Sequence, residues 1–150
     1  MPRRPHEEHK GRMASVVLFS YRQAKEKGII TLFRSHNPEY RDGEQMRDFI
    51  YVADVADALR FFAEHPELNG IYNLGTGRAR TFADLARAVF AALGREPRIE
   101  FVDTSEQFRR QYQYFTEADT RRLREAGYRK EFTTLEEGVR QYVGYLEKKN

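Results

Sequence analysis

The spacing of apolar positions predicts a helix at each end of the chain. From 13 to 27, apolar residues recur at helical spacing, and Gly28 follows where a left-handed residue ends a helix. Near the C-terminus, Thr134 and Glu137 predict a helix start, because a threonine followed three residues later by glutamate forms a capping box. The last helix is expected to bury one stripe of side chains, namely Leu135, Val139, Tyr142, Val143 and Leu146.

Between these helices, runs rich in β-branched and aromatic residues predict short strands. Such runs lie at 29–33, 46–52, 71–74 and 98–102. The polar stretch 35–43 has the composition of a loop and is long enough to reach a ligand. Short strands that alternate with helices predict the α/β class, and no repeat or linker divides the chain. We therefore expect a single domain over residues 1–150.

Three further helices are predicted from pairs of capping residues three positions apart. The pairs are Asp54 with Asp57, Thr81 with Asp84, and Thr116 with Asp119. The second of these helices is expected to end at Gly94 and the third at Gly127. The first is expected to place Val55, Leu59 and Phe62 on one face. Residues 103–115 show no clear period and are expected to cross the surface.

Composition excludes several classes of function. The chain has no cysteine, which excludes disulfides, thiolate zinc sites, iron–sulfur centres and cysteine nucleophiles. The 26 basic residues are interleaved with 23 acidic ones, so the net charge does not indicate a nucleic-acid partner. No apolar run approaches the roughly 18–20 residues of a membrane span, and the start lacks the apolar stretch of a signal peptide. We expect a cytoplasmic protein without a nucleic-acid or membrane partner.

Local motifs leave the chemistry open. The turn 75–77 could place backbone N–H groups against a phosphate, but it lacks the third glycine of the dinucleotide fingerprint, so a tight turn is the preferred interpretation. Arg47 could bind a diphosphate with its planar fork, or pair with Asp48 or Glu44 on the strand surface. Tyr112 could stack on a base or sugar, or pack in the core. No His-x-x-x-His spacing or Ser-His-Asp arrangement stands out, so no metal site is expected.

Longer segments resemble a known superfamily. Three segments resemble, in order and spacing, the C-terminal half of extended short-chain dehydrogenases/reductases of the NAD-dependent epimerase/dehydratase family: Arg-Asp-Phe-Ile-Tyr-Val-Ala-Asp-Val (47–55), Gly-Ile-Tyr-Asn-Leu-Gly-Thr-Gly (70–77) and Thr-Leu-Glu-Glu-Gly (134–138). Two more selective segments, His-Lys-Gly-Arg-Met-Ala-Ser (9–15) and Tyr-Gln-Tyr-Phe-Thr-Glu-Ala-Asp (112–119), are similar to those of ADP-glycero-manno-heptose 6-epimerases. The resemblance implies the substrate-binding part of a Rossmann-type enzyme.

By this resemblance, the enzyme would use NADP to oxidise carbon 6 of an ADP-heptose transiently, and so interconvert the D-glycero and L-glycero epimers for the lipopolysaccharide core. Lys10 matches the family's loop lysine, which implies an acid/base role and a contact with NADP. A lysine acts as a base only when neutral, so its pKa would have to be lowered. The implied substrate-binding residues are Arg12, Phe33, Arg34, Ser35, His36, Arg47 and Tyr112. The family also implies a homo-oligomer.

The sequence departs from the family where the cofactor would bind. It contains no Gly-x-x-Gly-x-x-Gly loop, and Tyr21 with Lys25 has the Tyr-x-x-x-Lys spacing but follows the lysine loop. The NADP-binding Rossmann part is therefore expected to be absent, and no turnover is expected from this polypeptide alone. Four interpretations stay open. The first two are half of an ADP-heptose epimerase and half of another nucleotide-sugar epimerase or dehydratase. The third is a non-catalytic remnant that binds nucleotide sugar or pairs with a separate NADP-binding chain. The fourth is a nucleic-acid-binding module built on the basic and aromatic residues near Tyr112, which the interleaved charges disfavour. In the superfamily the strand 71–74 joins the cofactor half's sheet, so an exposed edge with marginal stability or self-association is expected.

Overall fold

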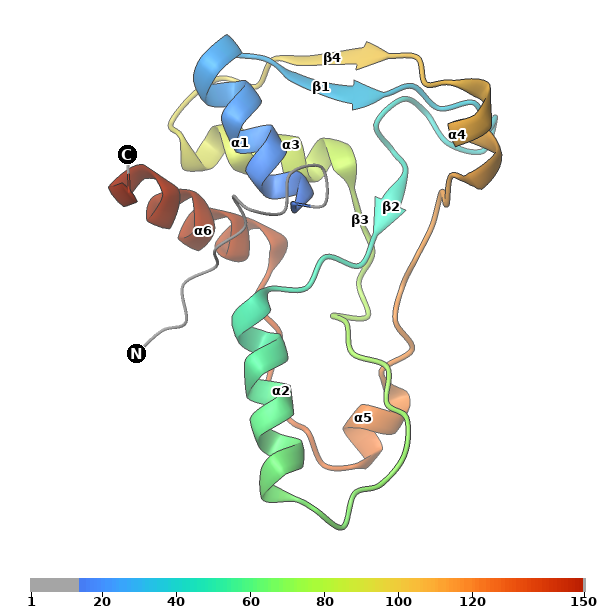
Figure 1. Cartoon of the computed structure of the whole chain (residues 1–150), viewed down its shortest axis with the longest axis vertical. Helices are drawn as coiled ribbons and strands as arrows, with labels where there is room; N and C mark the ends of the chain where they lie inside the picture. Colours follow the sequence, from blue (N-terminus) through green and yellow to red (C-terminus); the bar gives the residue numbers. More distant parts are fainter. Residues whose placement is uncertain (1–13, 150) are drawn as a thin grey trace.

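A computed structural model describes residues 14–149, which form six helices and four strands (Figure 1). The helices are α1 (Val16–Lys27), α2 (Val52–Glu64), α3 (Phe82–Ala92), α4 (Glu106–Gln111), α5 (Arg121–Glu125) and α6 (Leu135–Lys149). The strands are β1 (Ile30–Phe33), β2 (Met46–Arg47), β3 (Arg80–Thr81) and β4 (Ile99–Val102). The predicted alternation of short strands and helices is therefore present.

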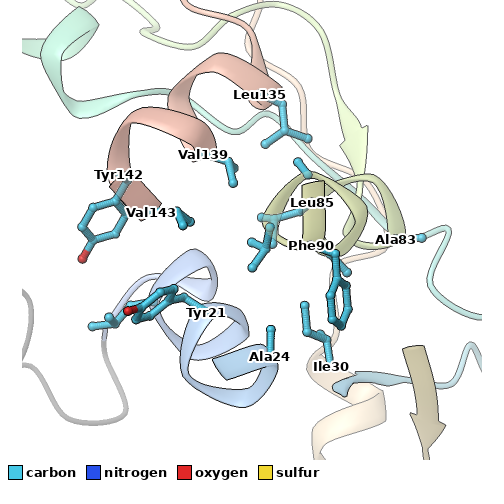
Figure 2. Close-up of a cluster of buried hydrophobic side chains, with 14 of the residues drawn as sticks. Tyr21, Ala24, Ile30, Ala83, Leu85, Phe90, Leu135, Val139, Tyr142 and Val143 are labelled. Atoms are coloured by element: carbon cyan, nitrogen blue, oxygen red, sulfur yellow. The ribbon is translucent and has the colours of Figure 1, made fainter. Parts of the chain in front are cut away.

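The main core lies where α1, α3 and α6 meet beside the parallel strands β1 and β4. The register of the strands places Ile30 opposite Ile99 and Phe33 opposite Val102. Figure 2 shows side chains of the three helices pointing toward one another, among them Val143 of α6 and Tyr21 of α1. Because β1 and β4 run in the same direction, the loops that follow them emerge at one end, beside α4 (Figure 1).

Several local predictions are confirmed. Gly28 ends α1 with a φ of 68°, in the left-handed region that glycine adopts without a steric cost. The Thr81 side chain accepts a hydrogen bond from the backbone N–H of Asp84, whose carboxylate accepts one in return, so α3 begins with the expected capping box. The predicted stripe of α6 is buried over its whole length.

The short strand β2 is the middle member of three neighbouring segments. On one side it pairs antiparallel with β3, with Arg47 opposite Arg80. On the other side, the Met46 N–H donates to the Tyr114 carbonyl at 2.8 Å, and the Thr116 N–H donates to the Met46 carbonyl at 3.3 Å. This arrangement brings the stretch that follows α4 against a strand far from it in the sequence.

A second, smaller hydrophobic cluster lies between α2 and α5, in the lower part of Figure 1. Its buried members are Ala58, Leu123 and Tyr128. The aromatic rings of Phe61 and Phe132 pack against them. The chain between α2 and β3 runs along this part without forming a strand within its described residues.

The prediction for α2 was wrong in its start. The helix begins at Val52 instead of Asp54, and Leu59 remains 63% exposed while Asp54 and Ala58 are buried. The reason is tertiary: the Asp54 carboxylate accepts hydrogen bonds from the backbone N–H and the hydroxyl of Thr133, at 2.8 and 3.0 Å. Because a buried carboxylate needs hydrogen-bond donors, the face of α2 that carries Asp54 lies against Thr133, in the segment before α6. The apolar Leu59 is left exposed to solvent.

Four other predicted elements also differ. The strand expected at 46–52 is only two residues long, and 71–74 is not a strand, because no neighbouring segment pairs with it. Residues 106–111 form a helix where none was expected. The helix expected from Thr116 begins at Arg121, because the segment before it is held by hydrogen bonds to β2 and Asp48.

Within residues 14–149, no helix is long and apolar enough to cross a membrane.

Candidate functional site

Arg47 occupies the centre of the candidate site, on the middle strand β2. Its guanidinium donates one hydrogen bond to the Met46 carbonyl at 2.8 Å. The guanidinium carbon lies 5.7 Å from the centre of the Phe82 ring and 5.6 Å from that of Tyr112, within cation–π range of both. Neither Asp48 nor Glu44 pairs with it, so the surface salt bridge considered from the sequence does not form among the described residues. The rings hold the guanidinium while its remaining N–H groups can meet an anion.

Tyr112 packs beside Arg47 and edge-on against Tyr114, with the ring centres 5.2 Å apart. Burial raises the pKa of the Tyr112 phenol above its ordinary value, although the nearby positive charge of Arg47 acts in the opposite direction. The phenol is therefore neutral at pH 7 and can donate a hydrogen bond.

The loop after β1 is ordered by Asp42. One carboxylate oxygen accepts from the Ser35 backbone N–H at 2.8 Å, and the other pairs with the Arg34 guanidinium at 3.0 Å. The His36 backbone N–H donates to the Tyr114 hydroxyl at 3.1 Å, which ties this loop to the stretch after α4. Phe33, at the end of β1, leaves 43% of its surface exposed.

The loops at this end of the fold enclose a small hollow. It is lined by Phe33, Arg34, His36, Thr104, Arg109, Tyr112 and Tyr114. Four of the predicted substrate-binding residues therefore lie together, and Arg47 adjoins them through its contact with Tyr112. Ser35 does not line the hollow, because its hydroxyl donates to the Asn37 carbonyl at 2.9 Å. The predicted residues Lys10 and Arg12 lie outside the described residues.

Arg109 and Thr104 line the hollow but were not among the predicted contacts. Asp103 holds this rim together, since its carboxylate lies 3.3 Å from the His36 ring and 3.6 Å from the Arg109 guanidinium. The Nε atom of Arg109 is buried and has no hydrogen-bond partner among the residues that the structure describes. The basic and aromatic run 109–115 was the signal in the sequence, but a six-residue helix is too short for periodicity to orient its side chains.

The turn 75–77 holds a carboxylate of the protein itself. The backbone N–H groups of Thr76 and Gly77 each donate to Asp48 at 2.8 Å, and the Thr76 hydroxyl donates to the same carboxylate. Because these amides already donate to Asp48, they are not available to a phosphate. The turn is therefore a tight turn, which was the preferred interpretation of the sequence. Residues 14–149 thus offer no glycine-rich cradle for the pyrophosphate of a dinucleotide.

A larger hollow, of about 430 Å³, lies where the turn 75–77, the segment after α5 and the start of α6 meet. None of the predicted residues lines it. Two of its arginines are already committed: Arg80 pairs with Glu136 at 2.6 Å, and Arg124 donates to backbone carbonyls. We therefore place the candidate site at the hollow beside Arg47 and Tyr112.

Comparison with known proteins identifies the relatives of the chain. The NAD dependent epimerase/dehydratase family matches residues 2–75. The ADP-L-glycero-D-manno-heptose-6-epimerase of Nitratidesulfovibrio vulgaris strain DP4 is 51% identical over 139 residues, which are 93% of this chain and 43% of that protein. The enzyme of the same name from Fusobacterium nucleatum is 46% identical, over 97% of this chain and 46% of its own length. The chain thus spans less than half the length of these curated relatives.

Solved structures agree with this relationship. The crystal structure of Helicobacter pylori ADP-L-glycero-D-manno-heptose-6-epimerase superimposes with a TM-score of 0.75 at 26% identity, over 95% of this chain and 41% of that one. UDP-N-acetylglucosamine 4-epimerase from Methanobrevibacter ruminantium M1 gives 0.78 at 20% identity, over 99% and 44%, and so shares the fold. The fold class and the family expected from the sequence are confirmed. The chain has the α/β fold of extended short-chain dehydrogenases/reductases over about 40% of their length, and it is a partial-length homologue of ADP-L-glycero-D-manno-heptose-6-epimerases within the NAD dependent epimerase/dehydratase family.

Proposed function

We propose that the chain is the substrate-binding domain of an ADP-glycero-manno-heptose 6-epimerase, and that it binds ADP-heptose at the hollow beside Arg47 and Tyr112. The observation that carries the proposal is the state of Arg47. Its guanidinium is fixed between two aromatic rings and has no carboxylate partner among the described residues. A fixed fork of this kind suits the two phosphates of a nucleotide sugar, which accept hydrogen bonds in pairs.

The other lining residues supply complementary chemistry. The exposed face of Phe33 offers apolar surface to the base or the sugar, and the neutral phenol of Tyr112 can donate to a phosphate or sugar oxygen. Arg34 and Arg109 also line the rim of the hollow, where Asp42 and Asp103 offset their positive charges. Their pairs with Asp42 and Asp103 fix the side chains in place.

In the proposed reaction, the epimers of ADP-glycero-manno-heptose interconvert through transient oxidation at carbon 6, with Lys10 as an acid/base group and Arg12 beside the substrate. NADP supplies the hydride chemistry when bound, and residues 14–149 do not fit its pyrophosphate. We therefore propose that the cofactor is held by residues outside this range, including Lys10, and by a Rossmann part that belongs to another chain or segment. We further propose that the complete enzyme is a cytoplasmic homo-oligomer and that its product is used in the synthesis of the lipopolysaccharide core.

Calorimetric titration of the chain with ADP-L-glycero-D-manno-heptose tests this proposal. We expect saturable binding, and at least about tenfold weaker binding by Arg47→Ala, because a charge-assisted hydrogen bond contributes about 1.5–3 kcal/mol. Arg140→Ala is the matched control, since Arg140 is exposed on α6 and pairs with Glu137. No binding by the wild-type chain would overturn the proposal. Tighter binding of a UDP-sugar would instead indicate another epimerase or dehydratase of the same fold.

A further inference from the structure

Asp48 connects three segments that are distant in the sequence. It directly follows Arg47, and its two carboxylate oxygens accept hydrogen bonds from the Thr76 N–H and hydroxyl, the Gly77 N–H at 2.8 Å and the Ala118 N–H at 3.0 Å. The end of β2, the turn 75–77 and the stretch 114–118 are therefore fastened to one side chain.

Only an ionised carboxylate fits this position. Four donors converge on it, and an aspartate accepts at both oxygens, whereas an asparagine would present an NH₂ group to some of them. Burial raises the pKa of Asp48, but the hydrogen bonds from Thr76, Ala118 and Gly77 outweigh burial and hold the pKa below its ordinary value. The site is also closely packed: a Cβ at Gly75 would lie 2.6 Å from the carboxylate.

The same segments carry the residues of the candidate site. Tyr112 lies just before the stretch 114–118 that is fastened through Ala118, and its ring contacts the Arg47 guanidinium. Between these points, the backbone of Met46 exchanges hydrogen bonds with Tyr114 and Thr116. The hydrogen bond from the Ala118 N–H to Asp48 continues this row of contacts between the two segments, at the end away from Tyr112. Without its charge, the Ala118 N–H and the turn 75–77 lose their acceptor, and the stretch 112–118 can shift relative to β2.

We infer that Asp48 is a positioning residue, whose carboxylate holds Arg47 and Tyr112 in the geometry that binds the nucleotide sugar. The effect on the ligand rests on the proposed function. The effect on the position of Arg47 does not rest on it, because Asp48, Arg47 and Tyr112 are already arranged in this way in the protein without ligand. Asp48 has no assigned contact with substrate, so its influence passes through Arg47 and Tyr112.

The test compares Asp48→Asn with Asp54→Asn. Asp54 is a buried carboxylate that likewise accepts hydrogen bonds from a threonine N–H and hydroxyl, but its partner is Thr133, just before α6. Both variants remove one internal negative charge and its hydrogen bonds. They therefore separate a general loss of stability from a specific loss of geometry at the site.

The first readout is the NMR resonance of the Arg47 Nε–H group in the free protein, which the rings of Tyr112 and Phe82 shift. We expect Asp48→Asn to move this resonance toward the value of an unstacked arginine, and Asp54→Asn to leave it in place. An unmoved resonance in Asp48→Asn would overturn the inference. If Asp48→Asn does not fold, Thr76→Val is measured in the same way; it removes the hydroxyl that donates to Asp48 and accepts from the Arg78 N–H, and leaves the backbone donors of Thr76, Gly77 and Ala118 in place. An unmoved resonance there also overturns the inference.

The second readout is ADP-heptose affinity in a double-mutant cycle. We expect Asp48→Asn to weaken binding by about tenfold in the wild-type background, and by about twofold or less in an Arg47→Ala background, because the two residues act through one contact. Equal losses in both backgrounds would show an effect independent of Arg47 and count against the inference. If the wild-type chain binds no ADP-heptose, the proposed function fails, and the Arg47 resonance still decides the role of Asp48.

Discussion

The guanidinium of Arg47 lies 5.6 Å from the ring of Tyr112, and the two residues come from distant parts of the chain. The contact depends on β2 standing between β3 and the stretch after α4. It gives a small fragment of an α/β fold a fixed cation beside a hollow lined by aromatic and basic side chains.

Arg47→Lys tests whether the shape of the cation matters as well as its charge. Lysine keeps the charge but loses the planar fork and most of the stacking on Tyr112 and Phe82. We expect about tenfold weaker binding of ADP-heptose by calorimetry, with little change in the midpoint of thermal unfolding. Arg140→Lys serves as the control. Equal affinities of Arg47→Lys and the wild-type chain would show that a point charge is sufficient.

Gly75→Ala is expected to destabilise the chain. The added methyl group would lie 2.5 Å from the Ala118 Cβ and 2.6 Å from the Asp48 carboxylate, so the segments joined there must separate. Overpacking of this kind costs about 1–3 kcal/mol of the free energy of unfolding, measured by urea denaturation. Gly144→Ala is the matched control: its Cβ meets nothing within 4 Å on helix α6, and we expect it to stabilise by about 0.5–1 kcal/mol. Equal effects of the two changes would contradict the packing described around Asp48.

Thr81→Ala removes the side-chain half of the capping box of α3. The lost hydrogen bond to the Asp84 N–H should cost about 1 kcal/mol of the free energy of unfolding. Thr120→Ala is the matched control, because Thr120 precedes α5 and its side chain makes no capping hydrogen bond. Chemical denaturation of both variants measures the difference, and a loss in Thr120→Ala as large as that in Thr81→Ala would exclude the cap as its source.

These capping signals show which parts of the fold the sequence could predict. Thr81 with Asp84, and Gly28 after α1, act on neighbouring residues, so the local pattern was sufficient. Asp54 with Asp57 has the same spacing of capping residues, which predicts a helix start. The Asp54 carboxylate, however, accepts hydrogen bonds from Thr133, which lies 79 positions away in the sequence. No local rule contains that partner, and the start of α2 was therefore misplaced.

The residues of the candidate site also fall into two groups, those that the sequence could identify and those that it could not. Arg47 and Tyr112 were identified by family resemblance, and the structure brings them into contact. Asp48 was noted only as a partner for Arg47, and Arg109 only as part of a basic run. Their positions depend on hydrogen bonds and loops that join distant segments. Local periodicity carries no information about such contacts.

The free energy of unfolding should depend on Asp48 in acid. Burial raises the pKa of Asp48, but hydrogen bonds from Thr76, Ala118 and Gly77 leave it below the ordinary 3.8. Because the folded pKa lies below the unfolded one, the carboxylate stabilises the fold above about pH 3.8, and this contribution is lost as the pH falls through the folded pKa. Urea denaturation of the wild-type chain and Asp48→Asn should show a constant difference from about pH 7 to pH 5 that narrows below about pH 3.8.

The comparison with Asp48→Asn is needed because other carboxylates titrate in the same range. Arg121 lowers the pKa of Asp119 to about 2, for example, and that group affects both proteins equally. A difference between wild type and Asp48→Asn that stays constant down to the lowest pH would contradict the assignment to Asp48.

Self-association is expected through the apolar surface left open around α2. The segment 71–74 was expected to be an unpaired strand edge. It is an irregular segment instead, and its Tyr72 ring packs against Phe62 of α2. Ile71 is 84% exposed, and Leu59 of α2 is also largely exposed. Large exposed apolar side chains favour association with other surfaces. Ile71→Asp should therefore shift the chain toward monomer in sedimentation velocity over about a hundredfold range of concentration, because the charge opposes burial of this surface. Asn69→Asp is the control, since it adds the same charge two residues away without removing apolar surface. A wild-type chain that stays a monodisperse monomer and unfolds in one sharp two-state transition would contradict this prediction.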